Sequence, residues 1–405
     1  MHNTTKFILK GDKSISHRLV ILGSICESDT IIENLSNCDD VLSTINCLKD
    51  CGAKINFINN KCIIKKSKLV DPKVDLNCGN SGTTARLLIG LLSGQGINAN
   101  FIGDESLKKR PMDRVLRPLS NMELKFESNN MKLPIKIFKS QLNAINISLN
   151  VPSAQVKSSL IFAGLGLKNR TTIKDPFSTR DHTEKLIEYL EANSDTANFL
   201  TGFNYCVPGD ISNAAFLIAA GLMLKKTKFH FKNVLFNKTR MGFVDSLIEM
   251  GAKIEICNII KKYNEKTCDI IVSCSNDLRG VVLDSDRVVK MIDEIPIFSI
   301  IACFANGRTI IKGVNELRYK ESDRVRSIYD NLSNMGADIS LRDSEIIING
   351  GNKLYNTTIN HFNDHRILMA FEVLSLYLNK KLPDYNSLVR ISFPDFYKHL
   401  NKIIL

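Results

Sequence analysis

Basic and hydroxyl side chains recur in short polar turns that stand directly before apolar, helix-like segments. The first three turns hold Lys13, Ser14 and Arg18, then Asn80, Ser81, Gly82 and Thr83, then Ser153 and Gln155. Further turns add Arg110, Arg180, Lys320, Arg324 and Arg366. A helix N-terminus presents free backbone N–H groups and a positive dipole end, and guanidinium groups bind carboxylates and phosphates in a bidentate manner. These turns therefore predict binding of a small anion from several sides.

A single turn of this kind has a simpler explanation. In KESDR, residues 320–324, Asp and Glu in the first turn of a helix complement the dipole, and Arg pairs with them. That alternative predicts a capped helix with solvated charges. Surface charges have no reason to recur at corresponding turns, so the recurrence favours a ligand site.

Carboxylates flanked by apolar residues are candidates for general acid–base chemistry. Asp293 and Glu294 lie in MIDEIPIF, where burial would tune a carboxyl group as a base. The alternative for Asp293 is helix capping. Three of the seven histidines, His17, His182 and His365, stand in polar turns without the spacing of metal ligands, so we expect no metal. The eleven cysteines include no CxxC pair and are expected to be reduced and structural.

A helix–turn–strand pattern that occurs six times must position these turns. The copies begin at Gly11, Cys78, Val151, Pro208, Ile292 and Asn363. In the fifth copy the apolar residues Val325, Ile328, Leu332 and Met335 have helical spacing, and Gly52, Gly251 and Gly336 are signals of helix C-termini. The copies are too long and irregular for a solenoid. We therefore expect an α/β or α+β fold with two domains of three copies each.

Composition limits the class of protein. The 405 residues are 44% hydrophobic with a net charge of +12, which excludes collagen-like and disordered chains and favours anionic partners. No apolar run approaches 18 residues, and no secretory signal is evident, so we expect no membrane span and a cytoplasmic location. Walker A, GxGxxG and GxSxG sequences are absent. Basic residues occur one or two per turn and aromatics make up 7%, which favours a small polyanion over nucleic acid.

Ten motifs in order carry a resemblance to a known family. They are DKSISHR, GNSGTTAR, RPM, SAQ, STRDHT, PGDIS, IDEIP, KESDR, NDHR and SFPDF. With them the chain resembles the 5-enolpyruvylshikimate-3-phosphate synthases, or 3-phosphoshikimate 1-carboxyvinyltransferases. The resemblance implies two similar domains, residues 12–208 and residues 1–11 plus 209–405, each of three βαβαββ units, with the active site in the interdomain cleft. It also implies transfer of the enolpyruvyl group of phosphoenolpyruvate to the 5-hydroxyl of shikimate 3-phosphate, without cofactor or metal, by a monomer.

The resemblance assigns roles to particular residues. Shikimate 3-phosphate would be bound by Lys13, Ser14, Arg18, Ser153, Ala154, Gln155, Arg180, Asp293 and Lys320. Phosphoenolpyruvate would be bound by Lys13, Gly82, Arg110, Gln155, Arg324 and Arg366. Asp293 would take the 5-hydroxyl proton, and Glu321 with Lys13 would protonate the methylene carbon. Gly82 would mark a form of the enzyme that glyphosate inhibits.

The chain differs from the family pattern at two places, and one alternative family remains. Many relatives have a Lys where this chain has Ile391, and the neighbouring Arg390 could replace it. The segment near residues 193–206 is shortened relative to the other copies. The rival is the UDP-N-acetylglucosamine enolpyruvyl transferase family, which typically has Lys-Asn in the first turn and a catalytic Cys in a loop. Here the first turn reads Lys13-Ser14, and the loop GDESLKKRPMDR contains no Cys.

Overall fold

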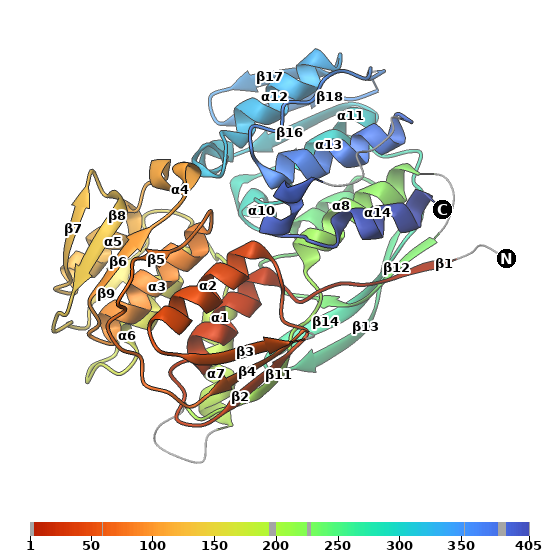
Figure 1. Cartoon of the computed structure of the whole chain (residues 1–405). Helices are drawn as coiled ribbons and strands as arrows, with labels where there is room; N and C mark the ends of the chain where they lie inside the picture. The colour runs from red at the N-terminus through yellow and green to blue at the C-terminus, as the bar shows by residue number, and fades with distance from the viewer. Residues whose placement is uncertain are drawn as a thin grey trace. The chain divides into compact units, whose positions relative to one another are not determined.

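The computed structural model of the chain divides into two compact units. It describes residues 4–58, 60–193, 200–224, 228–351, 353–379 and 386–404. One unit comprises residues 10–207, here the N-terminal unit, and the other comprises residues 1–9 and 208–405, here the C-terminal unit. Both units mix helices and sheets, which confirms the predicted α/β class (Figure 1).

The N-terminal unit contains seven helices and ten strands among its described residues. The helices are α1 (Lys13–Gly23), α2 (Asp39–Asp50), α3 (Gly82–Gly94), α4 (Glu105–Lys109), α5 (Asp113–Asn121), α6 (Ala154–Gly164) and α7 (His182–Ala192). The strands are β2 (Thr30–Glu33), β3 (Lys54–Ile58), β4 (Lys61–Lys65), β5 (Leu76–Asn77), β6 (Ala99–Ile102), β7 (Lys125–Asn129), β8 (Lys132–Phe138), β9 (Asn146–Ser148), β10 (Thr172–Lys174) and β11 (Asn204–Cys206).

The C-terminal unit contains the remaining elements. Its strands are β1 (Thr4–Ile8), β12 (Lys228–Leu235), β13 (Ile254–Lys262), β14 (Glu265–Val272), β15 (Val282–Leu283), β16 (Arg308–Lys312), β17 (Asp338–Arg342) and β18 (Glu345–Asn349). Its α-helices are α8 (Ile211–Met223), α9 (Gly242–Glu249), α10 (Ser285–Val289), α11 (Ile295–Phe304), α12 (Arg324–Asn334), α13 (His365–Tyr377) and α14 (Phe396–Ile404). Two 3₁₀ helices, η1 (Val314–Tyr319) and η2 (Ser387–Ile391), complete it.

Four sheets share one topology. Their strand orders are β11-β2-β4-β3, β5-β6-β8-β7, β1-β12-β14-β13 and β15-β16-β18-β17. In each, the first two strands are parallel and the last two form an antiparallel hairpin. Two of the sheets take their first strand from a distant part of the chain. Strand β11 pairs with β2, and β1, at the start of the chain, pairs with β12 (Figure 1).

The last copy in each unit is shorter than the expected βαβαββ pattern. In the N-terminal unit, β9 and β10 form a two-stranded parallel sheet. In the C-terminal unit, residues 353–379 and 386–404 contain no strand. The stretch KLYNTTINHFND, residues 353–364, lacks the alternation of apolar residues that a half-buried strand needs and is rich in Asn. The expected shortening near residues 193–206 falls largely on residues 194–199, which lie outside the described residues.

Inner helices form the core of each unit and begin at the polar turns. In the C-terminal unit, α8, α11 and α13 contact one another, and every residue of α8 is buried. In the N-terminal unit, α3 contacts both α1 and α6. Helices that are apolar all round are buried, so their N-termini are the places where polar side chains gather. Within the described residues no helix is long and apolar enough to cross a membrane.

Local predictions about helices agree with the structure. Helix α12 covers Arg324–Asn334 and buries Val325, Ile328 and Leu332. The three glycines expected at helix C-termini, Gly52, Gly251 and Gly336, have φ of 90°, 90° and 88°. An L residue adopts that left-handed conformation only at a cost, so glycine ends these helices. All eleven cysteines are free thiols, eight of them buried.

Candidate functional site

Three capped helix N-termini form the candidate site of the N-terminal unit. Asp12, Ser81 and Ser153 accept hydrogen bonds from the backbone N–H groups of the first turns of α1, α3 and α6. Side chains tie the helices together near these ends. Gln155 Nε2 on α6 donates to Thr83 Oγ1 on α3 at 2.9 Å. The arrangement leaves further first-turn N–H groups and dipole ends for an anion.

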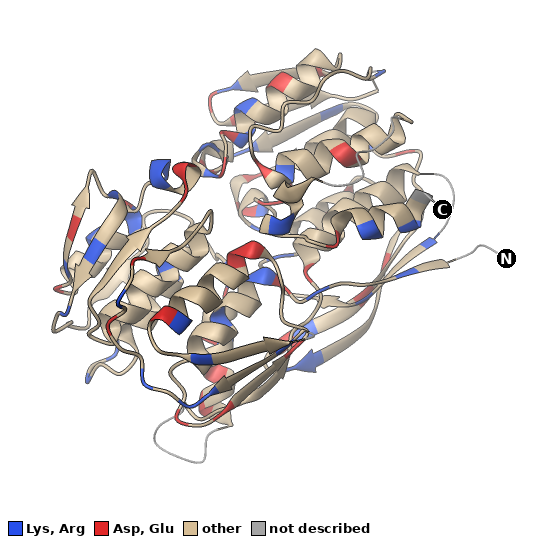
Figure 2. Ribbon diagram, in the orientation of Figure 1, with Lys and Arg blue, Asp and Glu red and all other residues tan. Residues whose placement is uncertain are grey.

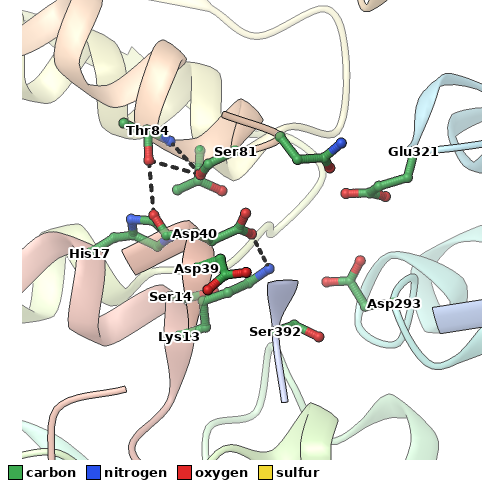
Figure 3. Close-up of polar contacts among 12 residues, drawn as sticks. Lys13, Ser14, His17, Asp39, Asp40, Ser81, Thr84, Asp293, Glu321 and Ser392 are labelled. Atoms are coloured by element: carbon green, nitrogen blue, oxygen red, sulfur yellow. Dashed lines mark hydrogen bonds and ion pairs between the residues drawn. The ribbon is translucent and has the colours of Figure 1, made fainter. Parts of the chain in front are cut away.

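Lys13, the first residue of α1, is held by a carboxylate of α2. Its Nζ lies 2.7 Å from Asp40 Oδ2, and Asp40 is buried. The Asp40 carbonyl oxygen in turn accepts from Thr84 Oγ1 at 3.1 Å, and Thr84 Oγ1 lies 2.8 Å from Ser81 Oγ (Figure 3). The ammonium of Lys13 and the first turn of α3 are therefore connected through one hydrogen-bonded network.

Arg18 is built into the interior of the N-terminal unit. It is 2% exposed, its Nε donates to Thr183 Oγ1 at 2.6 Å, and its Nη2 donates to Ser158 Oγ at 2.7 Å. Its Nη1 donates to the carbonyl oxygen of Ser14 at 2.8 Å. Arg18 thus joins α1, α6 and α7. Arg180, half-buried, places Nη1 3.5 Å from the hydroxyl of Ser14.

Two arginines flank the start of α3. Arg110 is 7% exposed and its Nη2 donates to Asn80 Oδ1 at 2.9 Å. Arg86, which the sequence analysis did not single out, donates from Nη1 to Gln155 Oε1 at 2.7 Å. A Cβ added at Gly82 would lie 2.5 Å from Nη1 of Arg86 and 3.4 Å from Nη1 of Arg110. Arg86 stands four residues after Gly82 in the GNSGTTAR motif, and that helical spacing was a signal that could have identified it.

In the C-terminal unit, Asp293 lies among three cations. Its Oδ1 is 3.6 Å from Lys320 Nζ, 3.4 Å from Arg324 Nη1 and 4.0 Å from Arg366 Nε. Arg366 also donates from Nη1 to the Asp293 carbonyl oxygen at 3.3 Å. Asp293 does not cap α11, whose N-cap residue is Glu294. The helix-capping alternative for Asp293 is therefore wrong.

Arg324 is the centre of this cluster and is 1% exposed. Its Nη2 lies 2.6 Å from Glu321 Oε2 and its Nε 2.8 Å from Oδ2 of the fully buried Asp364. Burial opposes the charge of Arg324, but Asp364 and Glu321 outweigh it and raise the pKa of the guanidinium. Burial likewise opposes ionisation of Asp364, and Arg324 holds the pKa of that carboxyl below its ordinary value. Sequence reasoning missed Asp364 and Asp40, because their partners are distant in the chain.

Of the alternative explanation of KESDR, a capped helix with solvated charges, only the capping is confirmed. Asp323 caps α12 by accepting from the backbone N–H of Arg326 at 3.0 Å. Arg324, however, is buried in an ion-pair cluster and is not solvated. Near the C-terminus, Arg390 is exposed and Ile391 is half-buried, so a role for Arg390 stays a prediction.

His17 lies within the buried network behind Lys13. Its Nδ1 is 2.7 Å from Thr44 Oγ1, and Thr44 Oγ1 is 2.7 Å from Thr84 Oγ1. Burial, followed by the charges of Lys13 and Arg18, lowers the pKa of His17 well below its ordinary value. The imidazole is therefore neutral at physiological pH.

Comparisons with known proteins agree over nearly the full length. A sequence model of EPSP synthase (3-phosphoshikimate 1-carboxyvinyltransferase) matches residues 4–400. The 3-phosphoshikimate 1-carboxyvinyltransferase of Caldicellulosiruptor saccharolyticus is 42% identical over 415 residues, covering 98% of this chain and 95% of the relative. That of Persephonella marina is 39% identical and covers 97% of this chain and 95% of its own.

Solved structures give the same result. An EPSP synthase structure from Acinetobacter baumannii has a TM-score of 0.84 and 33% identity, covering 99% of this chain and 96% of that one. The enolpyruvyl transferase NikO from Streptomyces tendae, at 15% identity and a TM-score of 0.74, shares the fold.

Proposed function

The chain belongs to the EPSP synthase (3-phosphoshikimate 1-carboxyvinyltransferase) family, and from this premise we propose how its side chains carry out the reaction. The enzyme is a transferase of the shikimate pathway, which serves aromatic amino-acid biosynthesis. It moves the enolpyruvyl group of phosphoenolpyruvate to the 5-hydroxyl of shikimate 3-phosphate and releases phosphate. The comparisons support this activity over transfer to UDP-N-acetylglucosamine.

Asp293 is proposed as the base. The 5-hydroxyl oxygen bonds to C2 of phosphoenolpyruvate while its proton passes to Asp293, and Glu321 with Lys13 supplies a proton to the C3 methylene. The tetrahedral intermediate then loses a proton from C3 and expels phosphate. The observation that carries this assignment is the Asp293 carboxylate, 3.6 Å from Lys320 Nζ and 3.4 Å from Nη1 of Arg324. The lysine and arginine side chains around Asp293 are placed to stabilise the negative charge that develops on the phosphate during transfer.

The substrate-binding residues follow from the two clusters. We assign shikimate 3-phosphate to Lys13, Ser14, Ser153, Ala154, Gln155 and Arg180 of the N-terminal unit and to Asp293 and Lys320 of the C-terminal unit. We assign phosphoenolpyruvate to Lys13, Gly82, Arg110 and Gln155 and to Arg324 and Arg366. The helix N-termini and arginines of each cluster supply the dipoles and bidentate donors that phosphates and carboxylates require.

Arg18 contributes to this proposal in a modified form. It remains assigned to shikimate 3-phosphate, but its three bonds to Ser14, Ser158 and Thr183 also give it a positioning task. Its bond to the carbonyl oxygen of Ser14 fixes the backbone that carries the Ser14 hydroxyl. A buried arginine whose nitrogens are engaged by protein can still order the residues that touch substrate.

Phosphate release tests the activity. The purified chain should release inorganic phosphate only when phosphoenolpyruvate and shikimate 3-phosphate are both present. Turnover with UDP-N-acetylglucosamine in place of shikimate 3-phosphate, or none with either, would contradict the assignment.

Figure 2 shows Lys and Arg distributed over both units rather than along one element, a pattern that does not favour an extended polyanion such as nucleic acid.

Location and assembly complete the proposal. We place the enzyme in the cytoplasm, where the pathway intermediates it consumes would be made, and we propose that it acts as a monomer. Analytical ultracentrifugation of the purified chain tests the second statement. Sedimentation as a single species of about twice the chain mass would contradict it.

A further inference from the structure

A buried lysine outside the proposed substrate contacts links two parts of the N-terminal unit. Lys157 lies on α6, one turn after Ala154, and is 5% exposed. Its Nζ is 2.9 Å from Asp175 Oδ2, 2.7 Å from Glu184 Oε1 and 3.4 Å from the carbonyl oxygen of Thr179. An ammonium has three N–H donors, and these three acceptors account for all of them.

Two of these acceptors, Asp175 and the Thr179 carbonyl oxygen, belong to the turn that leads into Arg180, and the third, Glu184, lies on α7. Asp175 Oδ2 also accepts from the backbone N–H of Thr179 at 2.9 Å and from its hydroxyl at 2.6 Å, while Oδ1 accepts from the N–H of Phe177 at 3.0 Å. Ser178 in this turn has φ of 49°, the left-handed region that a serine occupies at a cost of about 1 kcal/mol or more. The Asp175 carboxylate, itself held by Lys157, therefore stabilises a strained turn.

We infer that Lys157 is a positioning residue for shikimate 3-phosphate, holding the 175–179 turn so that Arg180 is presented in register with Ser153, Ala154 and Gln155. The inference rests on the proposed function, because it takes Arg180 as a ligand of that substrate. Lys157 is a buried residue of helix α6, and the Thr179 carbonyl that it holds immediately precedes Arg180 in the chain. Loss of the contacts of Lys157 with Asp175 and Thr179 allows the backbone at Ser178 to relax and displaces the guanidinium of Arg180.

The test compares the KM for shikimate 3-phosphate with the KM for phosphoenolpyruvate. Lys157→Met should raise the KM for shikimate 3-phosphate by about 10-fold or more and change the KM for phosphoenolpyruvate less than about 3-fold, since misplacement of one ligand group by about 1 Å can cost up to 100-fold. Arg180→Gln is the benchmark for loss of the guanidinium itself. The matched control is Glu184→Gln, which removes the charge of a partner of Lys157 and leaves the bonds of Asp175 to the turn in place.

A double variant separates geometry from charge. Lys157→Met leaves two carboxylates without their cation, which could repel an anionic substrate without any movement of the turn. Lys157→Met/Glu184→Gln restores the local charge to that of the wild type. A KM for shikimate 3-phosphate that stays high in the double variant supports positioning, and one that returns to the wild-type value overturns it.

Thr179→Val covers the case in which Lys157→Met does not fold. This nearly isosteric change removes the hydroxyl bond to Asp175 and keeps Lys157. It too should raise the KM for shikimate 3-phosphate selectively, and an unchanged KM would overturn the inference. A wild-type chain without turnover would instead refute the proposed function, and an unchanged KM in Arg180→Gln would refute only the assignment of Arg180.

Discussion

The ammonium of Lys13 lies 2.7 Å from Oδ2 of Asp40, and that carboxylate is carried by the first turn of a neighbouring helix. The Asp40 carbonyl oxygen is also bound by Thr84 of α3. Asp40 therefore sets the position of a proposed proton donor and joins it to the helix start that holds Gly82. A charge pair with one buried member is sensitive to the loss of either partner.

Asp40→Asn should lower kcat by about 100-fold, because Lys13 loses the charge that orients it, while the fold persists. Steady-state kinetics with both substrates and circular dichroism measure the two parts. Asp50→Asn, which removes an exposed carboxylate from the other end of the same helix, is the control and should have wild-type kinetics. Wild-type kcat in Asp40→Asn would show that Lys13 needs no such partner.

Asp293→Ala should effectively abolish turnover. We expect kcat to fall by about 100- to 10,000-fold, the range for removal of a general base. The fold should remain intact, because Arg324 retains Glu321 and Asp364 as partners. Phosphate release and thermal unfolding together test this. Asp330→Asn, at a surface ion pair with Arg326 in the same unit, is the matched control. Persistent activity in Asp293→Ala would refute the assignment of the base.

Local features of both units could be predicted from the sequence. The helix beginning at Arg324 followed from apolar spacing and a C-terminal glycine, both properties of a few neighbouring residues. The motifs near Lys13 and Asp293 were recognised for the same reason, and full-length comparisons confirm the family they indicate. Short-range patterns determine local structure because they specify backbone conformation and one buried face.

Partners distant in the chain could not be predicted. Arg324 is paired with Asp364, 40 residues away, and Arg18 with Thr183, 165 residues away, so neither pairing has a local signature. The pairing of β1 with β12 also has no local signature, and residues 1–11 were expected in the C-terminal domain only because the resemblance implies it. Such contacts depend on how finished helices and sheets pack, and a residue that looks solvated by its neighbours in sequence can be fully buried.

His17 predicts a loss of stability in acid. Its pKa is lowered mainly by burial, so below about pH 6.5 the unfolded chain takes up a proton that the folded chain does not. The free energy of unfolding therefore decreases as the pH is lowered. Between pH 7.5 and 5.5 this group alone should contribute a loss on the order of 1 kcal/mol.

Urea unfolding of His17→Gln at the two pH values measures that contribution. The glutamine keeps a polar group for Thr44 but does not titrate, so the stability of the variant should fall by on the order of 1 kcal/mol less than that of the wild type over this range. His361→Gln, at a partly exposed histidine, serves as the control. Equal losses in wild type and His17→Gln would show that another group causes the acid sensitivity.

Gly82→Ala tests the space at the start of α3. The added methyl would lie 2.5 Å from Nη1 of Arg86, the end of a flexible side chain, so the guanidinium must move and its 2.7 Å bond to Gln155 must weaken. Because Gly82 is helical, alanine should leave stability unchanged or slightly raised. We expect the KM for phosphoenolpyruvate to rise by about 3- to 30-fold, since one charged hydrogen bond is disturbed.

Glyphosate gives the same position a second readout. The wild-type chain should be inhibited, and Gly82→Ala should require a higher concentration for the same inhibition, because the methyl group crowds the anion beside Arg86 and Arg110. Gly164→Ala, at the far end of α6 with its nearest neighbour atom in Thr171, is the control for adding a methyl group. A wild-type inhibition curve that stays flat into millimolar glyphosate would contradict the proposal. A steep wild-type curve that Gly82→Ala leaves unshifted would instead place the inhibitor away from the start of α3.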